Sequence, residues 1–330
     1  MLTADVLNCS FPNWYTTFEK VTIPSTIIPL PEPVLEYLLE DAQLVLPVEC
    51  NSENMDGVED DYEDFGDINW EENTVSSELQ QKSFSEFSRK ITESLREMGG
   101  QMFIKLNWSS PKDATWIVFN NSLRCSSLSQ LYLLLKSSDF IVHDLTRPFK
   151  FCIDEETVKP SVQYSLILRN WLDVNPGSEF RCFVKEEELI AICQRDNSNY
   201  YDHIAIQQES IKQDIISFFR EHIKNKFPSA DFVFDVIRTK KDKVILVDFN
   251  PFGETTEALF FSWDELRDSS LDLEFRFATD SSGVQPHPYR HYSIPQDFVD
   301  LSSGTDPNKL IDFINLKNRT EEQRQDSDSD

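Results

Sequence analysis

The clearest periodic pattern in the chain is a stripe of apolar side chains between residues 83 and 100. Its members recur at helical spacing and are Phe84, Phe87, Ile91, Leu95 and Met98. Ser83 and Glu86 have the spacing of a capping box, and Gly99 with Gly100 is a common way to end a helix. The pattern therefore predicts a helix that begins at Ser83 and ends before Gly99.

Three further stretches predict helices. A short one runs from Pro33 to Leu39, with proline at its start. A second covers residues 126–140. The longest covers residues 200–227, where isoleucines and phenylalanines keep helical spacing and Asp202 is placed to cap the first turn.

Strand patterns alternate with these helices. Residues 101–107 and 164–171 are short, mostly apolar runs. Residues 179–185 and 189–195 flank a glutamate-rich turn and predict a β-hairpin, and residues 231–238 and 243–250 predict a second one. The mixture predicts an α+β fold with antiparallel sheets and packed helices.

The second hairpin ends in polar residues that a core strand does not need. If the chain turns about the midpoint of Lys241 and Asp242, Asp235 faces Asp248, and the two side chains lie roughly 5 Å apart. Asn250 points the same way as Asp248, since side chains on a strand alternate. Two opposed carboxylates repel each other unless a cation lies between them, and this oxygen set suits Mg²⁺. The alternative is that Asp248 and Asn250 bind backbone amides of residues 251–254 while Asp235 faces solvent.

Basic residues on the preceding strands complete a candidate nucleotide site. Lys105 ends one strand, Arg169 ends another, and Arg181 lies on the first hairpin, all placed to meet phosphate oxygens. Trp108 and Trp171 offer surfaces that could border a base. The chain has only eight glycines, and it contains neither the P-loop motif G-x-x-x-x-G-K-[ST] nor the dinucleotide-binding motif G-x-G-x-x-G. A nucleotide would therefore be held by side chains and a metal between two lobes.

Composition narrows the class of protein. The formal net charge is -27, and ten acids but no Lys or Arg fall within residues 51–72. Such a chain is repelled by phosphate backbones, so direct nucleic-acid binding is not expected. The acidic stretch is either a solvating linker or a docking segment for a basic partner or a kinase. Six scattered cysteines and the lack of a signal peptide or a membrane span predict reduced thiols in the cytosol or the nucleus.

Several longer motifs resemble one known family. They are "KLNWSSPKDATWI", "LRNW", "EFRCFVK", "QRDNSNYYDHI", "DFVFDV" and "VDFNPFGE". These are similar to the cell division cycle protein 123 family, a divergent clade of the ATP-grasp fold. The likeness implies a two-lobed fold with ATP and Mg²⁺ between the lobes. It also implies a cytoplasmic assembly factor for eukaryotic translation initiation factor 2 that supports translation initiation and cell cycle progression.

The resemblance implies roles for partners and residues. Members of the family bind the C-terminal domain of the γ subunit of the factor and promote joining of the α subunit. This protein is expected to be a monomer. Phosphate contacts fall to Lys105 and Arg181, and the loop after Lys105 contains Asn107, Trp108 and Ser110. The adenine-side hinge is Arg169, Asn170, Trp171 and Leu172, and the Mg²⁺ ligands are Asp235, Asp248 and Asn250. Lys112 stands where the family often has Arg, so it keeps the charge but lacks the guanidinium fork.

The expected domain organisation has five parts. Residues 1–47 pack on the core, 48–82 form an acidic disordered loop, 83–165 the first lobe, 166–318 the second lobe, and 319–330 an acidic disordered tail. The segment from Trp263 onward is the expected client-binding region. Two other functions remain open at this point. One is an ATP-grasp ligase that activates a carboxylate as an acyl phosphate, and the other is a scaffold without nucleotide.

Overall fold

A computed structural model describes residues 1–40, 44–51, 81–118, 120–268 and 272–279. The chain divides into two compact units, residues 1–287 and 288–330, and all described residues belong to the first. The acidic stretch from residue 52 and the acidic tail lie outside the described residues. So does most of the expected client-binding segment.

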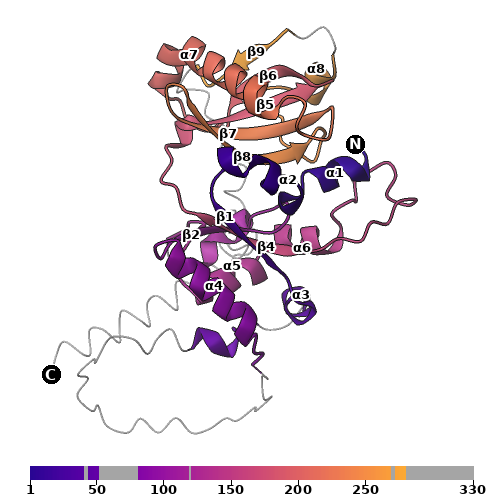
Figure 1. The fold of residues 1–330 in the computed structure, drawn as a ribbon, viewed down its shortest axis with the longest axis vertical. Coiled ribbons are helices and arrows are strands. Elements are labelled where there is room, and N and C mark those ends of the chain that lie inside the picture. The colour runs from indigo at the N-terminus through magenta and orange to yellow at the C-terminus, as the bar shows by residue number, and fades with distance from the viewer. Residues whose placement is uncertain (41–43, 52–80, 119, 269–271, 280–330) are drawn as a thin grey trace, which may run out of the picture. The chain divides into compact units, whose positions relative to one another are not determined.

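One lobe is built on a four-stranded antiparallel sheet (Figure 1). Its strands, in the spatial order β1-β4-β2-β3, are β1 (Ser25–Pro29), β4 (Ser165–Asn170), β2 (Met102–Lys105) and β3 (Arg124–Cys125). Its helices are α3 (Glu32–Leu39), α4 (Ser85–Glu97), α5 (Leu128–Lys136) and α6 (Asp139–Thr146). Their apolar faces meet in one core, where Ile91, Ile104 and Leu131 have no exposed surface. β4 belongs to this sheet, so the chain changes lobe after residue 170 and not at residue 165.

The predicted capping box of α4 is wrong. The helix begins at Ser85 with Phe84 as its N-cap residue, and no side chain of α4 caps it. Glu49, distant in sequence, takes that role instead. Its Oε1 accepts hydrogen bonds from the Phe84 amide at 3.0 Å and from the hydroxyls of Ser83 and Ser85. A carboxylate at this end of a helix also meets the positive end of the helix dipole.

The helix expected over residues 126–140 is two helices. α5 ends at Lys136, and Ser138 begins α6 by accepting a hydrogen bond from the Ile141 amide through its hydroxyl. Asp113 fixes the junction, since its carboxylate accepts hydrogen bonds from the Ser138 hydroxyl and from the amide of Asp139. Serine offers an alternative partner to helix amides, which is why the chain turns here.

The other lobe is built on a five-stranded sheet (Figure 1). Its strands, in the order β8-β7-β5-β6-β9, are β8 (Lys243–Pro251), β7 (Phe232–Lys240), β5 (Glu179–Lys185), β6 (Glu188–Gln194) and β9 (Glu274–Arg276). Both predicted hairpins are confirmed, and only the β6–β9 pair is parallel within the described strands. The long helix α7 (Asp202–Phe218) continues as a π-helical turn, Phe219–Ile223. Its N-cap residue is Tyr201 and not the predicted Asp202.

The predicted register of the second hairpin is confirmed where it matters. Asp235 pairs with Asp248, and Lys240 pairs with Lys243 across the two-residue turn Lys241–Asp242. Asp242 in this turn has a φ of 58°, in the left-handed region. Between these points the register shifts twice, after Asp235 and before Lys240, and the two shifts cancel. Counting residues outward from the turn therefore gives the right partner at Asp235 and Asp248, although the pairing between the turn and these residues is irregular.

The N-terminal segment joins both lobes. α1 (Thr3–Asn8) and α2 (Phe11–Phe18) pack on the five-stranded sheet, where the Trp14 and Phe18 rings contact Phe249 at 5.3 and 5.0 Å. A short helix, Glu19–Val21, follows, and β1 then pairs with β4 of the other sheet. Thr22 lies between and donates a hydrogen bond from its hydroxyl to the Leu246 carbonyl at 2.8 Å.

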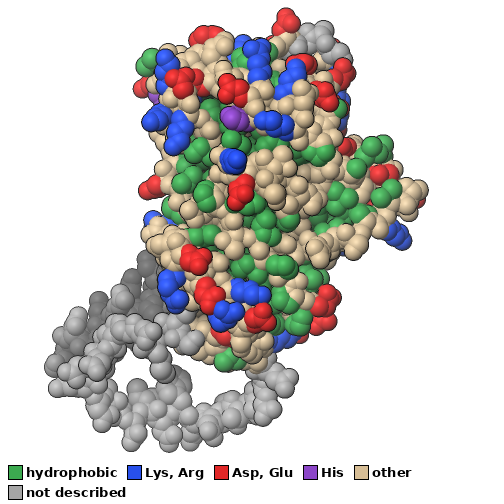
Figure 2. Space-filling view, in the orientation of Figure 1, with side chains coloured by type: hydrophobic (Ala, Val, Ile, Leu, Met, Phe, Trp, Pro, Cys, Tyr) green, Lys and Arg blue, Asp and Glu red, His purple; other side chains and the backbone are tan. Residues whose placement is uncertain are grey.

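The remaining short elements lie in connections. They are the 3₁₀ turns Val48–Cys50, Lys112–Ile117 and Pro176–Ser178, and helix α8 (Trp263–Arg267). All six cysteines are buried free thiols. Across the described parts of the chain, no helix has the length and apolarity needed to cross a membrane. Figure 2 shows green, hydrophobic side chains interrupting the charged surface on this face, and Phe151 and Ile153 are among the exposed apolar residues.

Candidate functional site

Asp235 lies at the centre of a charged cluster on the five-stranded sheet. Arg181 stands opposite it in the β5–β7 register and donates from Nε and Nη2 to its two carboxylate oxygens, both at 2.8 Å. Arg195 Nε lies 3.8 Å from Oδ2, and the Asn250 amide donates to the same oxygen at 3.3 Å. Burial opposes ionisation of Asp235, but Arg181 and then Arg195 prevail and lower its pKa.

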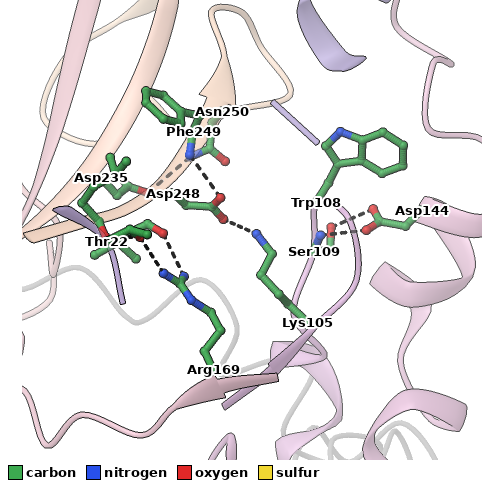
Figure 3. Close-up of polar contacts among 12 residues, drawn as sticks. Thr22, Lys105, Trp108, Ser109, Asp144, Arg169, Asp235, Asp248, Phe249 and Asn250 are labelled. Carbon is green, nitrogen blue, oxygen red and sulfur yellow. Dashed lines mark hydrogen bonds and ion pairs between the residues drawn. The ribbon is translucent and has the colours of Figure 1, made fainter. Parts of the chain in front are cut away.

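Asp248 is paired with a residue of the other sheet. Lys105, at the end of β2, donates from Nζ to Asp248 Oδ2, as Figure 3 shows. The Lys105 side chain is only 2% exposed and the Asp248 side chain 18%. The other Asp248 oxygen accepts a hydrogen bond from the Phe249 amide at 3.1 Å. This pair therefore connects the polar ends of both lobes at one point.

Arg169 supplies a second buried cation beside this pair. It is the penultimate residue of β4, and its Nη1 donates to the Val247 carbonyl at 2.8 Å while Nη2 donates to the Thr22 hydroxyl at 3.2 Å (Figure 3). Its Nε has no hydrogen-bond partner in the described structure. Burial lowers the pKa of Arg169 to about 10, although the nearby Asp248 carboxylate acts in the opposite direction.

The loop after Lys105 is fixed by its own side chains. Asn107 uses its whole amide: Nδ2 donates to the Ser10 hydroxyl at 3.0 Å and the Gln163 carbonyl at 2.9 Å, and Oδ1 accepts from the Ser165 amide. Trp108 Nε1 donates to the Val6 carbonyl at 2.8 Å. The Ser110 carbonyl accepts from the Lys112 amide. These three predicted site residues hold the loop, and their predicted nucleotide contacts stay predictions.

Asp144 of α6 also anchors this loop. Its two oxygens accept hydrogen bonds from the Ser109 amide at 2.7 Å and the Ser109 hydroxyl at 2.8 Å (Figure 3). Burial raises the pKa of Asp144 to about 6, and the two bonds from Ser109 offset only part of that effect.

Lys112 extends the cluster around Asp235. Solvent reaches its side chain, yet protein atoms surround it closely enough to lower its pKa to about 8. Removal from water is the main cause, and repulsion from Arg195 and Arg181 adds to it, while Asp235 and Glu257 act the other way. Lys112 therefore lies near Arg181 and Asp235, and its predicted phosphate contact stays a prediction.

The predicted hinge is the connection between the two sheets. The Asn170 amide donates to the Pro24 carbonyl at 3.1 Å and ends β4, and residues 171–178 lead to β5. Trp171 Nε1 is buried without a hydrogen-bond partner among the described residues, and Leu172 is 37% exposed. Arg169 itself reaches across to β8, so its side chain belongs to the charged cluster and not to the hinge.

The structure overturns one premise about the two aspartates. Their opposed carboxylates do not depend on a metal for compensation, because Arg181 neutralises Asp235 and Lys105 neutralises Asp248. Across the described residues, no group of three or more His, Cys, Asp and Glu side chains could hold a metal ion. The predicted Mg²⁺ ligands are two carboxylates and the Asn250 amide, so they are not a group of three such side chains. The alternative in which Asp235 faces solvent is wrong, since its side chain is 13% exposed.

The residues present nevertheless fit a nucleotide with Mg²⁺. Each carboxylate oxygen of Asp235 and Asp248 can accept more than one bond, so oxygens remain for a metal. Asn250 adds an amide oxygen on the same strand as Asp248. The unpartnered Nε of buried Arg169 and the exposed Lys112 ammonium are donors placed near these oxygens.

Sequence reasoning missed several members of this cluster. Arg195 lies beside Asp235 and also pairs with Glu257, at 3.5 Å between Nη1 and Oε2. Phe11 and Thr22 come from the N-terminal segment, which was expected only to pack on the core. Only Arg195 had a usable signal, because it lies two residues beyond Cys193, the partner of Arg181 in the first hairpin.

The chain is similar in sequence and in fold to proteins of one known family. The D123 family model matches residues 14–302. A Xenopus laevis protein named translation initiation factor eIF2 assembly protein is 47% identical, over 98% of each chain, and one from Danio rerio is 44% identical over 96% of this chain and 95% of its own. The solved structure of Cdc123 from Schizosaccharomyces pombe is 34% identical, with a TM-score of 0.68, covering 84% of this chain and 98% of that one. The predicted α+β class with two lobes built on largely antiparallel sheets is confirmed, and the ATP-grasp likeness stays a prediction.

Proposed function

The chain belongs to the D123 family, the cell division cycle protein 123 family that its motifs resemble, and on that premise we propose that it is an assembly factor for translation initiation factor eIF2 that binds ATP and Mg²⁺. The relatives carry the assembly function in their names. The similarity extends over nearly the whole chain, so the function proposed is that of the whole protein.

One observation carries the nucleotide part of the proposal. The Lys105–Asp248 pair brings the basic end of β2 and the acidic end of β8 to one place, where Arg169 and Arg181 also converge. Three buried cations, the nearby exposed Lys112 and several oxygen ligands meet there in a chain of net charge -27. Such local excess of cations suits a polyphosphate with a divalent ion.

The residues have separate tasks in this proposal. Asp235, Asp248 and Asn250 hold Mg²⁺, which neutralises phosphate charge when bound. Lys105 and Arg181 contact phosphate oxygens, Arg169 stabilises the metal ligands through the β8 backbone, and Asn170 with Trp171 and Leu172 borders the adenine. Asn107 and Ser110 keep the loop after Lys105 in place.

The proposed client is the γ subunit of eIF2, bound through its C-terminal domain, with promotion of α-subunit joining. Through assembly of the heterotrimer the protein supports translation initiation and, with it, cell division. We propose that it acts in the cytoplasm as a monomer. The nucleotide would fix the relative positions of the two lobes and so the surface offered to the client.

A binding assay tests the nucleotide part. Purified protein is melted with ATP alone, with Mg²⁺ alone and with both, and the rise in Tm should need both. Asp248→Asn, which keeps the side-chain shape, should abolish the rise while circular dichroism stays native. A full rise in that variant would reject the Mg²⁺ site.

A reconstitution assay tests the assembly part. Isolated γ subunit is mixed with α, with or without this protein and ATP·Mg²⁺, and the αγ complex is quantified by size-exclusion chromatography. More complex is expected with the protein and less with Asp248→Asn. Intact-mass measurement of the products separates assembly from ligation, since a covalent adduct would favour the ligase.

A further inference from the structure

Phe11 is a wholly buried aromatic residue that contacts two of the cations of the site, Lys105 and Arg169. It is the first residue of α2, outside both sheets, and has no exposed surface. The centroid of its ring lies 5.4 Å from Lys105 Nζ and 5.0 Å from Arg169 Cζ. Both distances are within the range of cation–π attraction.

The backbone of Phe11 is tied to the loop that carries Lys105. Its amide donates a hydrogen bond to the Asn107 carbonyl at 2.8 Å, and the Asn107 side chain donates to Ser10 at 3.0 Å. These two hydrogen bonds fix the position of the Phe11 ring relative to Asn107, two residues after Lys105. The two bonded segments are 97 residues apart in sequence.

The ring itself is held by aromatic neighbours. Trp14 contacts it edge-on at 4.5 Å between centroids, and Tyr15 stacks on it at 5.1 Å. The Tyr15 hydroxyl accepts a hydrogen bond from the amide of Ser25, the first residue of β1. These contacts leave the Phe11 ring little freedom to turn.

The charges explain why an aromatic face is useful here. Lys105 and Arg169 are each 2% exposed, and both lie near the single carboxylate of Asp248. Burial has removed most of the water around Lys105 and Arg169, and Asp248 is the single anion that both share. The negative face of a benzene ring partly replaces that water without competing for phosphate as another carboxylate would.

We propose that Phe11 is a positioning residue whose ring holds the Lys105 ammonium and the Arg169 guanidinium where they serve the nucleotide. This inference rests on the proposed function. It makes the N-terminal segment a part of the nucleotide site, beyond its packing on the core.

Graded weakening of the ring face tests the role without changing the fold. Phe11 is replaced by mono-, di- and trifluorinated phenylalanine and by Leu, and the affinity for ATP·Mg²⁺ is measured by calorimetry. Affinity should fall stepwise with each fluorine and on the order of tenfold for Phe11→Leu. Phe87→Leu is the control, because Phe87 is also buried, at 4% exposed in α4, and its ring is in none of the described cation–ring contacts.

A second readout uses no nucleotide. Protons on the Lys105 ε-carbon and the Arg169 δ-carbon should show ring-current shifts in NMR spectra that disappear in Phe11→Leu and persist in Phe87→Leu. Unchanged affinity across the folded fluorinated series, or shifts that survive in Phe11→Leu, would overturn the inference. Wild-type protein that binds no ATP·Mg²⁺ would instead overturn the proposed function, and the ring-current shifts would still decide whether the ring holds the cations.

Discussion

Lys105 and Asp248 form an ion pair between two sheets, with the lysine side chain 2% exposed and the aspartate 18%. They are 143 positions apart in the chain. Removing one member of such a pair leaves the other charge with little water and no partner, which costs about 3–5 kcal/mol in buried cases. The pair is therefore a point at which stability and ligand binding respond to the same substitution.

Lys105→Met should change metal and nucleotide affinities in opposite directions. The variant frees the Asp248 carboxylate, so affinity for Mn²⁺ alone, measured by electron paramagnetic resonance, should rise several-fold. Affinity for ATP should fall on the order of tenfold, because one phosphate contact is lost. Lys90→Met is the matched control, since Lys90 pairs with Glu86 on the surface of α4. Parallel losses of both affinities would contradict the placement of Lys105.

Gly177→Ala should displace the connection between the sheets. A Cβ at this position would lie 2.6 Å from the Tyr201 ring and 2.8 Å from the His203 ring, so the backbone or both rings must move. We expect a loss of about 1–3 kcal/mol in the free energy of unfolding, measured by urea titration. Gly253→Ala has its closest neighbour at 3.8 Å and should change little. Equal stability of the two variants would show that the close packing at Gly177 is absent.

Asp214→Ala should destabilise the protein without touching the nucleotide site. Asp214 of α7 accepts from Arg238 Nε at 2.6 Å, and both side chains are under 10% exposed. The loss should reach about 3–5 kcal/mol because Arg238 stays buried. The double variant Asp214→Leu with Arg238→Met should recover much of it. Glu93→Ala, at an exposed pair with Arg89, serves as control and should cost far less.

Asp144 should make stability depend on pH in a defined window. Its folded pKa of about 6 lies above the unfolded value of about 3.9, so the folded state binds more protons between these values. The unfolding free energy of wild type relative to Asp144→Asn should therefore fall as pH rises from 4 to 6, by at most about 3 kcal/mol, and then stay level. A relative stability that rises across this window would contradict the buried, Ser109-bound carboxyl.

Local pattern predicted most of the elements and one long-range pairing. The α4 stripe, both hairpins and the opposition of Asp235 and Asp248 follow from periodicity and turn position. The last of these survives because a two-residue turn at Lys241–Asp242 sets the register and later shifts cancel. A single uncompensated bulge would have placed Asp248 on the other face.

Contacts between distant segments were beyond the reach of local pattern. Glu49 caps α4 in place of Ser83, although 35 positions separate it from Phe84. The cations that neutralise the aspartates come from three different strands or strand ends, so spacing alone could not pair them. Phe11 reaches the site because α2 packs on the last hairpin, a fact that only tertiary structure contains.

Because the ribosome makes the chain from its N-terminus, α1 and α2 are synthesised long before the hairpin on which they pack. Trp14 and Phe18 are synthesised early, but the Phe249 ring on which they pack is made more than 200 residues later. At about 5–20 residues per second this delay is roughly 10–50 s. Through that interval two of the largest aromatic side chains lack their native partner. The N-terminal helices therefore reach their native packing only when the last hairpin has been made.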